Sequence, residues 1–234
     1  MSWTVDDLLA ALPEPEAYAI ADGATLRASW AGSCERVISY RARGVEPTDW
    51  LPLEIRFAYA VGHAVHEVVQ SGLKALFPEG ETEKAGSYPL SSVWSTDELP
   101  VPPDVTVGFH ADFWRPGGVV TPDLWRPGVV TEIKSMQTFP HRKARTEGVQ
   151  EWHLAQAGIA AIGLDAQRVE IVYVDKAKGD VDLYEFDPPV WQPAAQRALL
   201  SMLRGLALAT RIEPNRQHWR CRNCEFYTRC GEDG

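Results

Sequence analysis

The pattern of hydrophobic and polar positions changes its period along the chain, and each change predicts a different element. Apolar side chains recur at helical spacing from Leu53 to Leu76, and Pro52 suits the start of that helix. Alternation with a period of two, as in Arg168–Asp175, predicts strands. The predicted helices are 5–12, 29–43, 53–76, 147–164 and 189–212, and the predicted strands are 85–94, 105–114, 129–135, 168–175 and 181–186.

This order of elements predicts the fold class. Helices come first, three strands follow, and a helix, two strands and a last helix precede a polar, cysteine-rich tail. Interleaved helices and strands are typical of an α/β protein. No stretch is long enough to act as a linker, so residues 1–234 are predicted to form one domain. A near-repeat of Trp-Arg-Pro-Gly, at 114–117 and 125–128, is interpreted as two adjacent hairpin turns.

The composition of the chain bears on where the protein is located in the cell and on whether it binds nucleic acid. The 234 residues are 45% hydrophobic and 24% charged, which suits a well-cored globular domain. No apolar run approaches the roughly 20 residues of a membrane span, and the N-terminus lacks the pattern of a signal peptide. We therefore expect a cytoplasmic protein. The net charge of −9 argues against a general nucleic-acid coat and restricts any DNA contact to local basic patches.

The strand predicted at 129–135 carries the sequence pattern that most strongly suggests catalytic chemistry. Period two places Glu132 and Lys134 on one face and turns Ile133 into the core. A carboxylate beside an ammonium can hold a hard divalent cation and orient a water molecule. Glu-x-Lys also occurs on many solvated strands, so its interpretation depends on the motifs that accompany it.

Three further motifs accompany this strand in order. The long helix carries Gly-x-x-x-His ending at His66, the preceding strand carries Gly-x-x-x-Asp ending at Asp112, and the next helix carries Gln156. The series resembles the RecB-like nucleases of the PD-(D/E)xK superfamily. The resemblance implies a restriction-endonuclease-like core with a central mixed sheet flanked by helices. It further implies that His66, Asp112 and Glu132 bind Mg2+ or Mn2+, that Lys134 orients or activates the attacking water, and that Gln156 completes the catalytic set.

Two of these positions have competing candidates. His63 lies three residues before His66 on a similar helix face. Asp123 follows a proline and lies closer in sequence to the Glu-x-Lys strand than Asp112 does. The resemblance favours His66 and Asp112. Ala160 stands where the related Gln-x-x-x-Tyr motif has tyrosine, so the tyrosine's DNA contact does not carry over.

A basic run follows the Glu-x-Lys strand. It begins beside the aromatic Phe139 and contains Arg142, Lys143 and Arg145. We predict that these residues lie in a loop. Such a loop can hold a single-stranded phosphate backbone, and an ordinary solvated loop explains the pattern equally well.

Four cysteines are arranged as one plus three. Cys34 stands near the start, and Cys221, Cys224 and Cys230 form Cys-x2-Cys-x5-Cys near the end. In an intracellular chain this pattern favours metal or redox chemistry over disulfides. The surroundings of Cys34 and the closing motif resemble RecB-like nucleases with an iron–sulfur staple, including CRISPR-associated exonucleases and phage-encoded relatives. The resemblance implies a [4Fe–4S] cluster bound by all four cysteines, with zinc as the alternative.

The resemblance also implies how the chain is organised. Residues 45–190 approximate the nuclease core, and 29–44 with 213–234 form the cluster region that joins the two ends of the chain. Closing this region gathers arginines near one edge, where they could complete a DNA entrance: Arg36, Arg41, Arg216, Arg220 and Arg222.

These patterns together predict a divalent-metal-dependent DNA nuclease. The resemblance implies a single-stranded DNA exonuclease, commonly acting 5′ to 3′, in recombination, repair or CRISPR adaptation. A non-catalytic DNA-binding or assembly subunit with a structural four-cysteine site is the alternative. The sequence has no Gly-x4-Gly-Lys-Ser/Thr motif, which argues against ATP-driven unwinding by this chain. Oligomerisation or a protein partner is compatible with the sequence.

Overall fold

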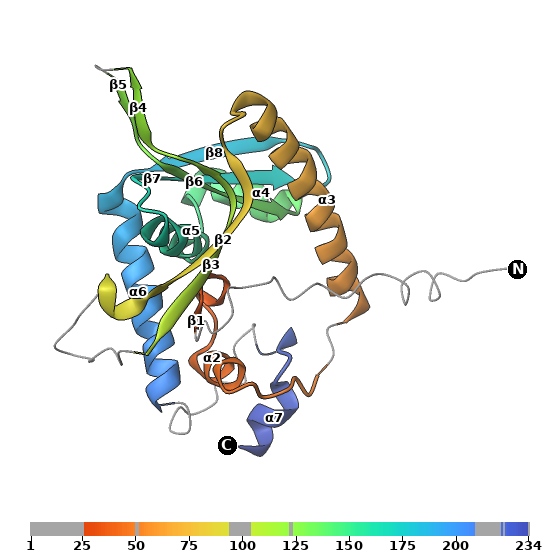
Figure 1. The fold of residues 1–234 in the computed structure, drawn as a ribbon. Helices are drawn as coiled ribbons and strands as arrows, with labels where there is room; N and C mark the ends of the chain where they lie inside the picture. The colour runs from red at the N-terminus through yellow and green to blue at the C-terminus, as the bar shows by residue number, and fades with distance from the viewer. Residues whose placement is uncertain are drawn as a thin grey trace, which may run out of the picture.

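The computed structural model describes residues 26–49, 52–93, 104–121, 124–208, 221 and 223–233. Its centre is a mixed sheet of six strands with helices on both faces (Figure 1). The α/β class and the mixed sheet flanked by helices, both predicted from the sequence, are confirmed. The strands of this sheet are β1 (Leu26–Arg27), β2 (Glu81–Pro89), β3 (Thr106–Arg115), β6 (Val129–Met136), β7 (Arg168–Asp175) and β8 (Val181–Phe186).

Strand pairing combines both directions. The buried pair β6–β7 is parallel, and two helices between these strands complete the crossover. β8 returns antiparallel to β7 through a turn at Gly179, whose φ of +73° lies in the left-handed region that glycine tolerates. β3 pairs with β2 along most of its length, and its other edge is divided between β1 and β6.

Helices cover the two faces of the sheet differently. α3 (Leu53–Leu76) lies on one face, whereas α5 (Glu151–Gly163) and α6 (Pro188–Leu208) lie on the other (Figure 1). Under α3 is a small core of Ile133, Val172 and Val174, against which the helix packs its own apolar stripe: Val65, Val69 and Leu73. The α5 and α6 face holds the larger core, where small residues such as Gly158 and Ala195 let the two helices pack closely.

The sheet opens between β3 and β6. These strands are paired from Arg115 with Val129 to Phe113 with Thr131, and their ladder stops there. Closer to its start, β3 pairs instead with the short strand β1, at Val107. β3 and β6 therefore form a fork, and the residues just past the last pair face the opening.

The near-repeat lies in a projecting ribbon. β4 (Gly118–Thr121) and β5 (Leu124–Arg126) form a separate antiparallel pair that continues the β3–β6 hairpin away from the sheet (Figure 1). The two Arg-Pro-Gly copies lie at the junctions of this ribbon with β3 and with β6. A Cβ at Gly128 would lie 3.3 Å from the backbone N of Gly117, so the two junctions are close together.

The two ends of the described chain pack together below the sheet. α2 (Glu35–Ala42) lies beside the C-terminal helix α7 (Tyr227–Glu232), although they are far apart in sequence (Figure 1). The remaining described elements are α4 (Thr138–Glu147) and the 3-10 helices η1 (Ala28–Trp30) and η2 (Leu90–Ser92). The described parts of the two terminal segments therefore contact each other, and their closure around a metal cluster stays a prediction.

Several predicted boundaries were wrong. The strand predicted at 85–94 lies at Glu81–Pro89, and the helix predicted at 147–164 begins only at Glu151, after a break at Gly148 with φ of +84°. The basic run is not a loop, because it forms α4. Predictions at 5–12 and 209–212 lie outside the described residues.

Within the described residues, no helix is both long and apolar enough to cross a membrane. The cytoplasmic location expected from the sequence stays a prediction.

Candidate active site

Asp112 lies where β3 and β6 separate. Its Oδ2 accepts a hydrogen bond of 2.6 Å from the backbone N–H of Ile133. The backbone pairing of β3 with β6 ends at Phe113 and Thr131, so beyond that pair this side-chain bond connects the two strands. Its Oδ1 lies 3.5 Å from His66 Nδ1. Asp112 is only 6% exposed, and these two contacts hold the carboxylate at the opening of the fork.

Glu132, Lys134 and Gln156 meet on the α5 side of the sheet. Lys134 Nζ lies 2.5 Å from Glu132 Oε1 and donates to Gln156 Oε1 at 3.1 Å. Gln156 Nε2 in turn donates to Glu132 Oε1 at 2.7 Å. The shared face predicted for Glu132 and Lys134 is confirmed, and Ile133 is fully buried on the other face.

His66 reaches the site because α3 packs closely on β6. One turn earlier, a Cβ at Gly62 would lie 3.2 Å from Ser135 Oγ, so a glycine at this position lets the helix approach the strand. The alternative His63 has its ring centroid 6.5 Å from that of His66. The alternative Asp123 lies outside the described residues. The structure thus brings His66, Asp112, Glu132, Lys134 and Gln156 together, and their roles stay predictions.

Two further residues join the site that sequence reasoning did not select. Glu83 on β2 and His110 on β3 form an ion pair, with 2.6 Å between Glu83 Oε2 and His110 Nε2. Together with Asp112 they make a group whose potential ligand atoms all lie within 4.8 Å of one another. Gln70 of α3 connects this group, because its Nε2 donates to the Glu83 carboxylate and, at 3.0 Å, to the Asp112 carbonyl oxygen.

The sequence contained one signal for this group. His110 precedes Asp112 by two residues on a predicted strand, so period two already places both side chains on the same face. Glu83 had no such signal, because the predicted strand began at residue 85 and left Glu83 outside it. The misplaced strand boundary therefore hid a site residue.

Burial and neighbouring charges shift the pKa values of Glu132 and Asp112 in opposite directions. Burial, and then the neighbouring Asp112 charge, raise the pKa of Glu132 to about 7, while Lys134 opposes this rise. Burial would also raise the pKa of Asp112, but the hydrogen bond with His66 and the charges of His66 and Lys134 lower it overall. Burial would lower the pKa of Lys134, but the Glu132 and Asp112 carboxylates raise it, so its ammonium stays charged.

This donor set fits a divalent cation. Glu132 Oε2 is buried and has no hydrogen-bond partner among the described residues. A buried carboxylate oxygen without a partner is costly, and a cation would satisfy it. Carboxylate oxygens and imidazole nitrogens are ligands that Mg2+, Mn2+ and related ions accept in proteins. The motif resemblance described above implies that His66, Asp112 and Glu132 are the metal ligands.

The basic residues of α4 are partly engaged elsewhere. Arg145 donates two hydrogen bonds to the Asp182 carboxylate of β8, from Nε at 2.5 Å and from Nη2 at 3.0 Å. Lys143 Nζ lies 3.4 Å from Glu147 Oε2. Arg142 is exposed. The expected loop would have presented all three cations together, whereas the helix directs Arg145 toward an acidic strand.

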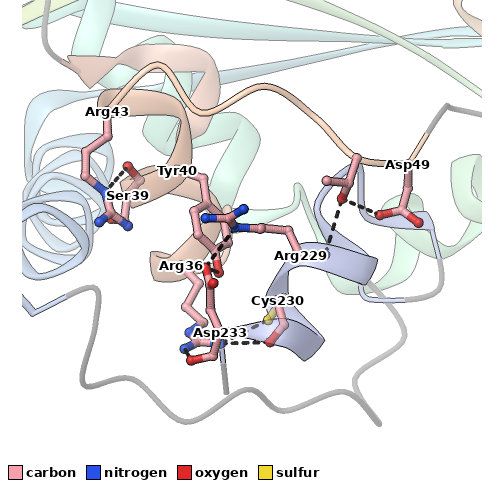
Figure 2. A network of polar contacts seen from close by, with 9 residues as sticks. Arg36, Ser39, Tyr40, Arg43, Asp49, Arg229, Cys230 and Asp233 are labelled. Atoms are coloured by element: carbon pink, nitrogen blue, oxygen red, sulfur yellow. Dashed lines mark hydrogen bonds and ion pairs between the residues drawn. The ribbon is translucent and has the colours of Figure 1, made fainter.

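The cysteine region is held by contacts between α2 and the tail (Figure 2). Cys34 is the N-terminal cap residue of α2 and is exposed. Burial raises the pKa of the Cys224 thiol, and the nearby Cys221 and Cys34 thiols add to that rise. Arg36 donates to Cys230 at its carbonyl oxygen, 3.1 Å away, and at its Sγ, 3.3 Å away. The fold thus gathers cysteines from both ends of the chain.

The structure contradicts the predicted arginine entrance near the cysteines at Arg36. Arg36 is 5% exposed and points to Cys230 and Asp233, so it is not available to bind DNA (Figure 2). Arg41 forms an ion pair of 2.7 Å with Glu225. The other three arginines of that prediction lie outside the described residues: Arg216, Arg220 and Arg222.

Comparisons with known proteins bear on the fold. No protein-family model matches the chain, and no curated protein matches it. The crystal structure of SSO0001 is similar with a TM-score of 0.57 at 17% identity, covering 92% of this chain and 88% of that one. LHK-Exo in complex with dAMP gives a TM-score of 0.47 at 13% identity, covering 79% and 87%. An alkaline exonuclease (LHK-Exo) from Laribacter hongkongensis gives 0.41 at 12%, covering 79% and 89%. At 17% identity, the similarity to SSO0001 shows a shared fold and leaves the activity to be argued from the site.

Proposed function

We propose that this protein is a divalent-metal-dependent DNA nuclease that hydrolyses phosphodiester bonds. The observation that carries the proposal is the convergence of Asp112, Glu132 and Lys134 at the β3–β6 fork, where Glu132 Oε2 is buried without a partner. Two carboxylates that can bind a cation, beside an ammonium that stays charged, suit a reaction in which negative charge develops on phosphate oxygens.

Each side chain has a distinct part in the proposed reaction. Asp112, Glu132 and His66 would hold Mg2+ or Mn2+, which supplies a Lewis acid and lowers the pKa of a bound water. Because its ammonium stays charged, Lys134 orients the attacking water or stabilises the developing negative charge. Gln156 contacts both Glu132 and Lys134, so it would hold these two side chains in a fixed position relative to each other.

We extend the proposal to the substrate on the basis of the motif resemblance. It favours single-stranded DNA, attack from an end and 5′-to-3′ polarity, in recombination, repair or CRISPR adaptation. For strand contact we propose α4, and within it Arg142 and Lys143 ahead of Arg145, whose charge Asp182 compensates.

Nuclease activity is tested with purified protein and DNA labelled at either the 5′ or the 3′ end, in Mg2+ and in Mn2+. We expect K134A to reduce the cleavage rate by about 10²- to 10³-fold. K178A removes an exposed lysine of the β7–β8 turn and should cleave like wild type. Circular single-stranded DNA separates endonuclease from exonuclease action, and the two labels report polarity.

Two results would contradict this proposal. Binding of DNA without cleavage by wild type would favour the non-catalytic DNA-binding or assembly subunit. Equal cleavage by wild type and K134A would remove Lys134 from the reaction.

We further propose that Cys34, Cys221, Cys224 and Cys230 bind a [4Fe–4S] cluster that ties the chain ends together. The proposal rests on the resemblance of the two cysteine motifs to those of iron–sulfur nucleases. It is supported by the contacts of Arg36 in α2 with Cys230, which hold the segment after Cys34 against the C-terminal segment. Tetrahedral zinc is the alternative.

The cluster proposal includes the organisation of the chain. Residues 45–190 would form the nuclease core, and 29–44 with 213–234 the cluster region. Anaerobic purification followed by iron and zinc determination tests it, and we expect a brown protein with about four irons per chain. A colourless protein that contains zinc and no iron would refute the cluster.

A further inference from the structure

Glu83 and His110 lie beside the proposed ligands and are not explained by them. His110 and Asp112 are two residues apart on β3, and Glu83 lies across from Asp112 on β2. Gln70 of α3 contacts Glu83, and His66 of α3 lies 3.5 Å from Asp112 Oδ1. The potential ligand atoms of Glu83, His110 and Asp112 lie within 4.8 Å of one another. We propose that Glu83, His110 and Asp112 form a second cation site that binds Mn2+ and shares Asp112 with the first site.

The backbone of β2 is distorted where it contributes Glu83. Thr82 pairs with Phe113 and Lys84 pairs with Ala111, but the ladder is interrupted between them, at Glu83. Glu83 has φ of +53°, in the left-handed region that non-glycine residues rarely adopt. This distortion explains how a residue in the middle of a strand turns its carboxylate toward Asp112.

Gln70 acts as a positioning residue for this group. It is only 7% exposed, and its single amide nitrogen donates both to the Glu83 carboxylate and to the Asp112 carbonyl oxygen. The amide of one α3 residue therefore fixes β2 and β3 relative to each other at the distorted point. The three donors keep their spacing because this bridge is buried.

A separate observation concerns the buried carboxylate beside this group. Glu132 Oε2 is buried without a hydrogen-bond partner among the described residues. Lys134 lies beside Glu132, His66 beside Asp112 and His110 beside Glu83. A single divalent ion at the first site would satisfy Glu132, and the ion-paired Glu83 and His110 would remain as donors for a second ion.

The donor chemistry selects the ion. Mg2+ prefers oxygen ligands in an octahedral arrangement. Imidazole nitrogen binds transition-metal ions more readily than Mg2+, and Mn2+ is the transition-metal ion that also suits carboxylate oxygens. His110 is therefore expected to discriminate in favour of Mn2+. The side chain of Glu83 is 45% exposed and that of His110 is 19% exposed, so an ion can enter from solvent without opening the core.

The second ion would deepen the proposed nuclease chemistry, and to that extent this inference rests on the proposed function. Two ions about 3.5–4 Å apart stabilise both the attacking and the leaving oxygen in two-metal phosphoryl transfer. A carboxylate shared between the sites, here Asp112, is the group that would connect them. Binding of Mn2+ can nevertheless be measured without any cleavage.

The test is Mn2+ binding to the full chain, followed by electron paramagnetic resonance of the free ion. We expect wild type to bind two Mn2+, whereas E83Q and H110Q weaken one of the two sites by at least about tenfold. E81Q is the matched control, because Glu81 lies on the same strand and pairs with Lys84 outside the site. Circular dichroism confirms that each variant is folded.

The results separate this inference from the proposed function. A single Mn2+ bound by wild type, or unchanged Mn2+ affinity in both E83Q and H110Q, would overturn the second site. Two bound Mn2+ without DNA cleavage would support the second site and contradict the nuclease. DNA cleavage with unchanged Mn2+ binding in E83Q and H110Q would do the reverse.

Discussion

Replacing Glu132 by glutamine should stabilise the metal-free protein while it removes a proposed metal ligand. Burial and the Asp112 charge raise the pKa of Glu132 from 4.5 to about 7, so the folded protein binds this proton more tightly than the unfolded chain does. Stability from this group is therefore fully present below pH 4.5, falls as the pH rises toward 7, and stays low above it. At 1.36 kcal/mol for each pKa unit, the loss is about 3 kcal/mol.

Glutamine reproduces the protonated acid closely. Its carbonyl oxygen can still accept from Lys134 and Gln156, and its amide occupies the place of Oε2 without a charge. We therefore expect E132Q and wild type to have similar free energies of unfolding at pH 4.5. At pH 8 the variant should be more stable by about 3 kcal/mol.

The assay is urea unfolding in the presence of a chelator at several pH values from 4.5 to 8.5. E147Q is the control, because Glu147 is exposed at the end of α4 and should show no comparable rise. Adding Mn2+ should stabilise wild type more than E132Q, because the variant lacks a ligand. If E132Q were no more stable than wild type at pH 8 without metal, the inferred cost of the buried Glu132 charge would be wrong.

Three other substitutions test the packing and the charges. In G205A the new Cβ would lie 2.7 Å from the Glu35 carbonyl oxygen, so α2 must move off α6 and the free energy of unfolding should fall by about 1–3 kcal/mol in urea titrations. G72A is its counterpart, because nothing lies within 4 Å of that position in α3 and the change should stabilise by about 0.5–1 kcal/mol; a loss there would show that the helix is constrained in another way. The pKa of Asp182 is lowered, first by its hydrogen bond with Arg145, so its contribution is present at neutral pH and is lost as the pH falls through that lowered pKa. D182N should therefore lower the thermal midpoint at pH 7 and leave it less sensitive to acid below about pH 4, and an unchanged midpoint at pH 7 would contradict this account.

The spacing of residues in the sequence was sufficient to predict most helices and strands and the shared strand face of Glu132 and Lys134. The helix predicted at 53–76 and the strands at 168–175 and 181–186 are confirmed with those bounds. Period two was enough to place Glu132 and Lys134 on one face of β6, since side-chain direction in a strand depends only on position. The motif order also selected residues that the fold brings together, namely His66, Asp112 and Gln156.

Sequence spacing failed where the outcome depended on distant partners. Arg142, Lys143 and Arg145 were assigned to a loop because their run is polar, but α4 forms against β7 and β8, where Thr138 donates to Asp175 and Arg145 to Asp182. Propensity is a weak guide for such a segment, because tertiary contacts override it.

The sequence by itself determined which side chains share a strand face and which helices carry an apolar stripe. Only the tertiary structure decided that β3 and β6 part after Phe113, that Gln70 bridges Glu83 and Asp112, and that Arg36 turns inward to Cys230. The physical reason is that these contacts join residues separated by 13 to 194 positions. Whether two such residues meet depends on how whole helices pack on the sheet, and the spacing of residues within one element contains no information about that.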